Sequence, residues 1–374
     1  MAPPELMDDL IGEILLRLPP EDPGCLVRAS LVCKPWRRLL SDPSFPRRYR
    51  EFHGVPPLLG FLHYVKKCGD FLSPFFPSFF PIKEASPILN PPPEPKSYIL
   101  DCRHGRVLLF NYSNKDLIVW DPITNSRQDL GWPPKLEHYF CFRAAVLCAL
   151  DGCDHLSCRG GPFLVVLVAI DFPNEIGGDG ASARTYSSET GAWSTGVSSL
   201  HVGFPMNGHK MIGSSLLARG ALYFMLDKGR SILKYDLAGC GMSVMSAPPF
   251  TGPVGNMVLV KAEGGGLGAC GVEGHNLHLW AWRSTGGPNG GIPEWERSRV
   301  MDIQLDIADL STQLDVVDFA EGAGSMFVLA NKDVFAVDLK SGRARKIGKR
   351  GRFKVIFPFM SFYSLMPTDL FPQS

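Results

Sequence analysis

Apolar side chains recur every four residues near the start of the chain, which is the spacing of one face of an α-helix. Pro19 and Pro20 end this predicted helix, because proline has no amide hydrogen to donate and its ring clashes with the preceding turn. The apolar stripe consists of Leu6, Leu10, Ile14 and Leu18, with Ile11 and Leu15 widening it on one side.

Further short helices are predicted directly after this one. An apolar stretch runs from Cys25 to Cys33, Pro35 suits the first turn of a third helix, and Asp42-Pro43 suits the start of a fourth. Three or four short helices within residues 1–50 bury too little surface to be stable alone. We therefore expect their apolar faces to pack against another protein or against the rest of the chain.

The order and spacing of these residues resemble an F-box. Two positions depart from that pattern, since Pro3-Pro4 stands where Leu-Pro is usual and the second helix follows Asp22-Pro23-Gly24. An ordinary helical subdomain packed on the following domain is the alternative. The resemblance rests on Pro4, Leu6, Leu10, Glu13–Leu15, Arg17–Pro19, Leu31–Lys34, Trp36, Arg37, Leu39–Asp42 and Phe45.

The resemblance implies a partner rather than a reaction. F-box domains dock on a Skp-type adaptor and, through it, on the cullin scaffold of a ubiquitin ligase. The charge distribution fits a docking surface. All charged side chains in residues 1–22 are acidic except Arg17, and all charged side chains in residues 28–50 are basic except Asp42. The adaptor-binding residues that the resemblance implies are Pro4, Leu6, Leu10, Ile14, Leu15, Leu18, Pro19, Val32 and Trp36.

Residues 51–97 are predicted to be a linker that is rich in proline and phenylalanine. The density of prolines in residues 68–97 is incompatible with a regular helix or a central strand. The phenylalanines there argue against a simple solvated linker, so we expect this segment to lie against the next domain. Pro57–Val65, at its start, is a possible strand that meets Phe353–Leu365 and closes the following domain.

From residue 98 to residue 374 the pattern changes to short strands and tight turns, which predicts an all-β domain. Asn331-Lys332 separates two such strands and indicates a hairpin. An aromatic or aliphatic residue followed by a polar turn recurs near Asp121, Ser187, Asp236 and Asp338, with Leu279-Trp280-Ala281 as a further member. This period predicts a β-propeller of about six blades. A β-sandwich or two smaller β domains are the alternatives.

The β domain resembles the F-box-associated β-propeller that is common in plant F-box proteins. The resemblance implies a domain that holds a protein substrate. Net charge is +1 over 374 residues and gives no reason to expect nucleic acid. The longest apolar run, Phe163–Ile170, is too short to cross a membrane, and the N-terminus has no signal-peptide pattern. The ten cysteines then suggest a reducing cytoplasmic or nuclear location.

Motifs for cofactors and catalysis give weak signals. Gly266–Gly271 fits G-x-G-x-x-G, but a strand rather than a helix is predicted after it, so it lacks the helix N-terminus that binds phosphate. Cys148, Cys153, His155 and Cys158 lie close in sequence, but their spacing differs from zinc knuckles, and we interpret them as buried or loop thiols. We expect no catalytic, cofactor-binding or metal-binding residues.

Together these observations predict the substrate-recognition subunit of a Skp–cullin–F-box ubiquitin ligase, a protein that itself catalyses nothing. An F-box protein that acts outside any ligase differs only in whether a cullin joins. The alternative from another class is a β-propeller enzyme or ligand-binding protein with a helical N-terminal extension. A ligand in the central channel would favour that alternative.

Overall fold

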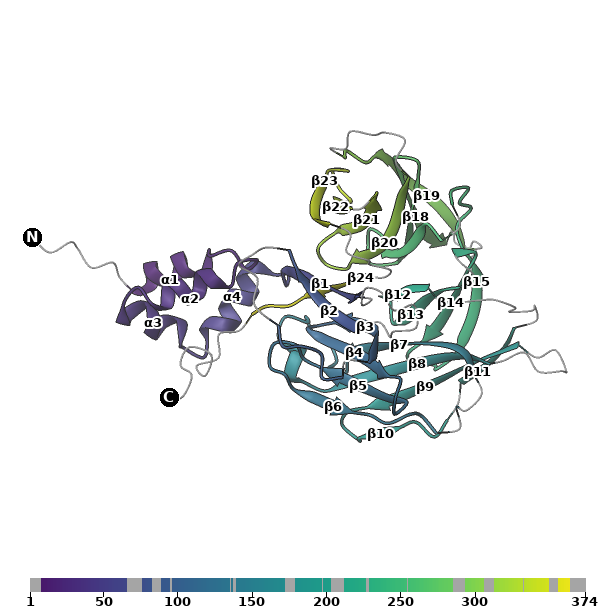
Figure 1. The fold of residues 1–374 in the computed structure, drawn as a ribbon, viewed down its shortest axis with the longest axis horizontal. Coiled ribbons are helices and arrows are strands. Elements are labelled where there is room, and N and C mark those ends of the chain that lie inside the picture. Colours follow the sequence, from purple (N-terminus) through teal and green to yellow (C-terminus); the bar gives the residue numbers. More distant parts are fainter. Residues whose placement is uncertain are drawn as a thin grey trace, which may run out of the picture.

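The computed structural model describes residues 8–65, 76–82, 89–94, 96–134, 136, 139–171, 179–196, 198–202, 212–226, 229–253, 255–284, 293–305, 313–331, 333–349 and 356–363. Four short helices come first and strands follow (Figure 1). In the described residues, no helix is long and apolar enough to cross a membrane.

The N-terminal helices begin and end where the local sequence favours it. Asp8 and Asp9 stand in the first turn of α1, where acidic groups complement the partial positive charge of a helix N-terminus. Proline opens α3 and α4, because the first turn needs no amide donor. Gly54 ends α4 with a φ of 70°. The helices are α1 (Asp8–Leu16), α2 (Gly24–Ser30), α3 (Lys34–Leu40) and α4 (Phe45–His53).

Two predicted boundaries move. The fourth helix begins at Phe45 rather than at Asp42-Pro43. The carboxylate of Asp42 accepts the Ser44 amide hydrogen at 2.7 Å and so forms the turn that precedes the helix. Because α4 continues to His53, the predicted end of the helical domain at residue 50 falls inside this helix.

The helical domain completes its core with side chains from the β domain, as its small size required. Phe362, which follows the last described strand, is buried in this core, and Leu156 packs against it. The ring of Tyr49 meets the ring of Phe362 edge-on, and its hydroxyl donates to the Leu18 carbonyl at 2.7 Å. The buried residues of the helices themselves are Ile11, Leu15, Leu16, Leu26, Ala29, Leu40, Phe45 and Tyr49.

The strands form six antiparallel sheets arranged as the blades of a β-propeller, in agreement with the prediction (Figure 1). The first blade in sequence is β3 (Ser97–Arg103), β4 (Arg106–Asn111), β5 (Asp116–Trp120) and β6 (Arg127–Asp129). The second is β7 (Tyr139–Cys148), β8 (Phe163–Asp171), β9 (Asp179–Ser187), β10 (Ala192–Trp193) and β11 (Ser198–Val202). The third is β12 (Ile212–Ala218), β13 (Ala221–Leu226), β14 (Ser231–Asp236) and β15 (Met242–Ser246). The fourth is β16 (Met257–Lys261), β17 (Leu267–Glu273), β18 (Asn276–Ser284) and β19 (Pro293–Asp302), and the fifth is β20 (Leu314–Ala320), β21 (Ser325–Ala330), β22 (Asp333–Asp338) and β23 (Ala344–Lys349).

The sixth blade closes the ring and joins the first strands of the propeller to its last strand. It consists of β2 (Phe76–Pro81), β1 (Leu58–Val65) and β24 (Ile356–Met360), in that order. Leu62 pairs with Phe357, so the predicted meeting of Pro57–Val65 with Phe353–Leu365 is confirmed for the described residues. The helices lie beside this blade, as predicted, because α4 leads almost directly into β1 (Figure 1).

β2 shows how the proline-rich segment fits the fold. Its two prolines lie in a strand, but that strand is at the edge of its sheet, where a missing amide donor costs little. The ring of Phe80 stacks on Phe61, and Phe79 packs into the neighbouring core. The predicted linker therefore lies against the propeller in its described part, with aromatic side chains packed inward.

The loose sequence repeat corresponds to one turn, which joins the third and fourth strands of a blade. The carboxylate of Asp121 accepts the amide hydrogens of Ile123 and Thr124 at 2.9 and 3.3 Å. Asp236 and Asp338 do the same in their blades, and the Ser187 hydroxyl accepts one such hydrogen. The repeat thus reflects side chains that satisfy turn amides. Leu279-Trp280-Ala281 lies within a third strand rather than at its end.

Apolar packing between neighbouring blades holds the ring together. Each neighbouring pair shares one buried cluster, which draws on strands of both blades. The closing blade is held on both sides, since Phe359 shares a cluster with Trp120 of the first blade and Phe61 shares one with Phe327 of the fifth. The innermost strands β3, β7, β12, β16, β20 and β24 surround the central channel.

Candidate functional site

The N-terminal helices expose large apolar side chains. Leu10 and Ile14 are 48% and 45% exposed on α1. Leu31 and Val32 are 74% and 63% exposed between α2 and α3. Because Leu10 and Ile14 are four residues apart, they share one face of α1, whereas Ile11 and Leu16 are buried. Grouped exposed apolar side chains are typical of a protein-binding surface.

The predicted adaptor contacts fall into several groups in this structure. Pro4 and Leu6 lie outside the described residues. Leu15 is fully buried in the core of the helical domain in this structure, so its contact with an adaptor stays a prediction. Leu18 and Trp36 pack partly against the same core, while Leu10, Ile14, Pro19 and Val32 are exposed.

The acidic and basic halves of the helical domain partly neutralise each other. Asp8 on α1 pairs with Arg38 on α3 at 3.3 Å, and Glu13 on α1 lies 3.9 Å from Arg48 on α4. These pairs are largely exposed and contribute little to stability. The charge separation seen along the sequence is therefore only partly available to a partner.

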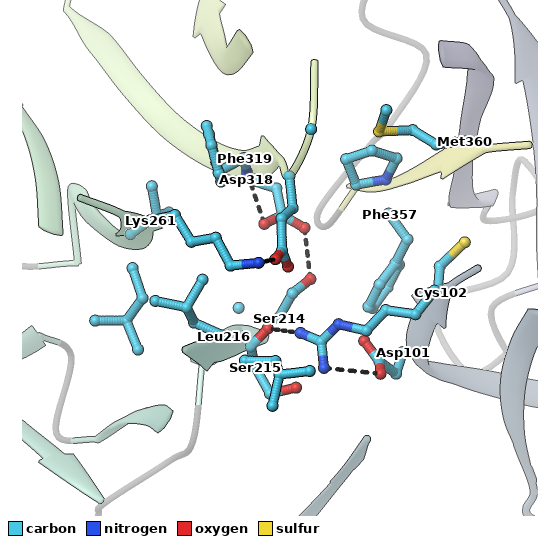
Figure 2. Close-up of a pocket in the computed structure, with 18 of the residues that line it drawn as sticks. Asp101, Cys102, Ser214, Ser215, Leu216, Lys261, Asp318, Phe319, Phe357 and Met360 are labelled. Atoms are coloured by element: carbon cyan, nitrogen blue, oxygen red, sulfur yellow. Dashed lines mark hydrogen bonds and ion pairs between the residues drawn. The ribbon is translucent and has the colours of Figure 1, made fainter. Parts of the chain in front are cut away.

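The central channel forms a cavity of about 800 Å³, within the range of ligand-binding pockets. Figure 2 shows Asp101, Ser214 and Asp318 projecting toward the same space from separate strands. Val55, which follows the helical domain, and Leu156, from the β7–β8 connection, line it as well. This end of the channel therefore lies at the junction with the helices.

Polar ties cross the channel between blades that are not neighbours. The guanidinium of Arg103 on β3 donates to the Ser215 carbonyl on β12, and it lies 3.6 Å from the Asp101 carboxylate. The hydroxyl of Ser214, also on β12, donates to the carboxylate of Asp318 on β20 at 2.6 Å (Figure 2). β12 is thus linked to both β3 and β20 through the middle of the ring.

The cavity contains one carboxyl group that titrates near neutral pH. Burial raises the pKa of Asp318 to about 7, although hydrogen bonds from Ser214 and from the Phe319 amide oppose this effect. Burial also raises the pKa of Asp101, against the attraction of Arg103. A pKa near 7 suits a general acid or base. Both oxygens of Asp318 already accept hydrogen bonds, however, which fits a structural tie between blades.

Replacing Asp318 with asparagine is expected to flatten the pH dependence of stability. With a folded-state pKa of about 7, the folded chain holds a proton that the unfolded chain loses near its ordinary value of 3.8. Wild-type stability therefore falls as pH rises from about 4 to about 7, by on the order of a few kcal/mol. The asparagine variant lacks this loss, so urea unfolding at pH 8 should show it to be the more stable protein.

Asp315→Asn is the matched control, because it makes the same change at an exposed position of the same strand. Its urea midpoints at pH 5 and pH 8 should follow those of wild type. If Asp318→Asn retains the wild-type decline in stability between these two pH values, the assignment of that decline to Asp318 is wrong.

The sequence did not predict these channel residues, because the partners of each tie lie more than a hundred positions apart. A weak local signal existed, since Asp101 and Asp318 each interrupt an apolar run and a buried carboxyl needs a partner. Gly266–Gly271 enters β17, and β18 follows it, so the strand predicted after this motif is confirmed.

The three cysteines that were interpreted as buried or loop thiols lie together in space with His155. The potential ligand atoms of Cys148, Cys153, His155 and Cys158 are all within 4.8 Å of one another. Their spacing in the sequence differs from that of zinc knuckles. They nevertheless lie close in space, because the β7–β8 connection brings Cys153, His155 and Cys158 next to Cys148 at the end of β7. Cys158 is buried, and the other three are partly buried.

Comparison with known proteins finds two family models in the chain. The model of the F-box domain matches residues 4–48, and a model described as F-box protein AT5G49610-like, beta-propeller, matches residues 98–364. No curated protein matches the chain.

Solved structures resemble the chain at low sequence identity. A nidogen/laminin complex has 11% identity and a TM-score of 0.42, covering 80% of this chain and 96% of that one. A protein from Lactobacillus plantarum also has 11% identity and a TM-score of 0.42, covering 78% and 82%. The WD40 domain of SCAP from fission yeast has 11% identity and a TM-score of 0.37, covering 71% and 56%.

Proposed function

The chain belongs to the F-box proteins with an AT5G49610-like β-propeller, and we propose that it is the substrate-recognition subunit of a Skp–cullin–F-box ubiquitin ligase. The F-box docks on the Skp-type adaptor and, through it, on the cullin. The propeller binds a protein substrate and presents its lysines. The chain contributes proximity, because it raises the effective concentration of substrate near the conjugating enzyme.

The observation that carries this proposal is the exposed apolar surface of the F-box helices. Leu10 and Ile14 are large apolar side chains that are nearly half exposed on α1, and Val32 is more exposed still. A docked adaptor would bury these side chains. The contacts that we propose from the described residues are Leu10, Ile14, Leu18, Pro19, Val32 and Trp36, with Pro4 and Leu6 preceding them in the sequence.

The other end of the propeller is the proposed substrate face. The helices and the β7–β8 connection occupy the end of the channel near Val55 and Leu156. The opposite end, where the innermost strands begin, is farther from the F-box and is formed by loops that packing constrains least. Free thiols such as Cys25 and Cys240 suit a reducing compartment, either the cytosol or the nucleus.

Affinity purification of the full chain, and of a chain without residues 1–53, tests this proposal. We expect the full chain to retain a Skp-type adaptor, a cullin and substrate proteins, and the shortened chain to keep only the substrates. Adaptor without cullin would favour an F-box protein that acts outside a ligase. Absence of both from the full chain would contradict the proposal.

A second candidate function is ligand binding in the channel. Among the described residues that line the cavity, three polar atoms lack a hydrogen-bond partner: Nη1 of Arg103, which lies 3.6 Å from the Asp101 carboxylate, Nε2 of His104 and the hydroxyl of Ser215. A polar small molecule or a substrate side chain could bind to these atoms. Native mass spectrometry of the purified chain tests this candidate, because a bound molecule that Arg103→Ala releases would support it.

A further inference from the structure

The end of β7 and the loop that follows it bring together three thiols and one imidazole. Cys148 is the last residue of β7, and Cys153, His155 and Cys158 lie in the connection to β8. Their ligand atoms are within 4.8 Å of one another, and the Cys158 sulfur is 3.7 Å from Nδ1 of His155. These residues form a compact group with four potential donors.

The donor set and its dimensions fit a zinc site. Three cysteines and one histidine form one of the common tetrahedral sets for structural Zn²⁺. With zinc–sulfur bonds of ~2.3 Å, a tetrahedron places its sulfur atoms about 3.8 Å apart. The ligand atoms lie at most 4.8 Å apart, so the distances between them would have to shorten by about 1 Å at most when zinc binds. Small rotations of the side chains would be enough for this change.

Two backbone amides donate hydrogen bonds to sulfur atoms of the cluster. The amide of Leu150 donates to the sulfur of Cys148, and the amide of His155 donates to the sulfur of Cys153, each at 3.4 Å. Metal binding deprotonates a thiol, and these N–H groups would then face the metal-bound sulfur atoms. The ring of His104 packs against that of His155 at a tilt of 36°, with centroids 4.1 Å apart, and so restrains its orientation.

A buried cation next to the cluster lacks a full set of partners. Arg106 is 4% exposed and donates through Nη2 to the carbonyls of Cys158 and Gly161. Its Nη1 has no hydrogen-bond partner. Three thiolates with one Zn²⁺ carry a net charge of −1, which would compensate this guanidinium.

The loop that carries these ligands connects the propeller to the helical domain. Leu156 packs against the helical core, and the Ser157 hydroxyl accepts a hydrogen bond from Arg50 of α4 at 3.2 Å. Arg159 pairs with Asp121 of the first blade at 3.1 Å. A rigid loop at this place would fix the orientation of the two domains.

We propose that Cys148, Cys153, His155 and Cys158 bind one Zn²⁺ ion, and that this ion fixes the β7–β8 loop between the propeller and the helical domain. The inference rests on these side chains and their surroundings, and it holds whether or not the chain serves a ubiquitin ligase. The ion has a structural role, since all four of its positions are taken by protein ligands.

Metal analysis of the full chain, purified with reductant and without chelator, tests the proposal. We expect about one zinc ion per chain in the wild type. Cys153→Ser and Cys158→Ser should each lose most of it. Cys240→Ser is the matched control, because Cys240 is exposed in the turn between β14 and β15, and it should retain the wild-type zinc content.

Cobalt replacement keeps the test valid if a serine variant fails to fold. Wild-type protein refilled with Co²⁺ should show visible bands of a tetrahedral ion and a near-ultraviolet thiolate-to-cobalt charge-transfer band. A reduced wild-type chain that contains no zinc and gives no such spectrum would overturn the proposal. Zinc that both serine variants retain in full would overturn the assignment of its ligands.

Limited trypsin digestion tests the role of the ion in the loop. Cleavage after Arg159 should be slow in the zinc-loaded chain and at least tenfold faster after chelation, because the loop would lose its constraint. Mass spectrometry locates the cut. Equal cleavage at this bond with and without zinc would show that the ion does not hold the loop.

Discussion

Replacing Ile14 with aspartate is expected to abolish capture of the Skp-type adaptor while the chain stays folded. Ile14 is 45% exposed, so the charge remains in water in the free protein and costs little stability. In the complex, the same carboxylate would enter an apolar contact, at a cost on the order of several kcal/mol. We expect adaptor binding, measured by surface plasmon resonance, to weaken by at least a hundredfold, which corresponds to about 3 kcal/mol.

Val300→Asp is the matched control for this variant. Val300 is an apolar residue of β19 with 49% exposure, and it lies on a propeller blade away from the helices. It should bind adaptor as wild type does, and both variants should retain the wild-type melting temperature and substrate. An Ile14→Asp protein that binds adaptor at wild-type strength would show that α1 docks through a different face.

Deleting residues 353–374 is expected to unfold the whole β domain rather than shorten a tail. The deletion removes β24, the strand of the closing blade that pairs with β1 and lines the channel. Four buried apolar side chains are lost: Ile356, Phe357, Phe359 and Phe362. At about 1.5–3 kcal/mol each, their burial contributes on the order of 6–12 kcal/mol. Since folded domains are stable by only about 5–15 kcal/mol, little would remain.

Loss of the cooperative transition in thermal unfolding, followed by circular dichroism, measures this effect. A chain that ends at Tyr363 is the matched control, because it keeps β24 and Phe362 and should melt as wild type does. Phe359→Ala gives a graded test, with an expected destabilisation of about 3–5 kcal/mol. A chain without residues 353–374 that keeps its melting temperature and its substrate would contradict closure by β24.

The predictions that succeeded rest on local chemistry. The pairing of β21 with β22 and the first turn of α3 at Pro35 follow from turn residues and proline geometry, which act within a few positions. The repeated turn at Asp121, Asp236 and Asp338 has the same origin, because each carboxylate binds amides two and three residues ahead. Closure by strands from both ends of the β domain followed from a general requirement, since an open ring would leave unpaired strand edges.

The sequence did not determine which apolar side chains of α1 stay exposed, for a physical reason. Helical spacing places Leu10, Ile14 and Leu15 on one half of α1. It does not decide which of them the three other helices cover. The core that the four helices share with Phe362 and Leu156 includes Leu15, whereas Leu10 and Ile14 stay exposed.

The amino-acid sequence by itself determined a small helical domain of F-box pattern, a β domain of about six blades and the strands that close it. These features depend on residue spacing, turn chemistry and the alternation of apolar residues, all of which involve residues that are close together in the sequence. Only the tertiary structure decided which side chains meet across the channel and around Cys158. Ser214 and Asp318 are 104 positions apart and approach only once the ring has closed. The thiols and His155 converge because their loop packs between two domains, and no sequence spacing encodes that contact.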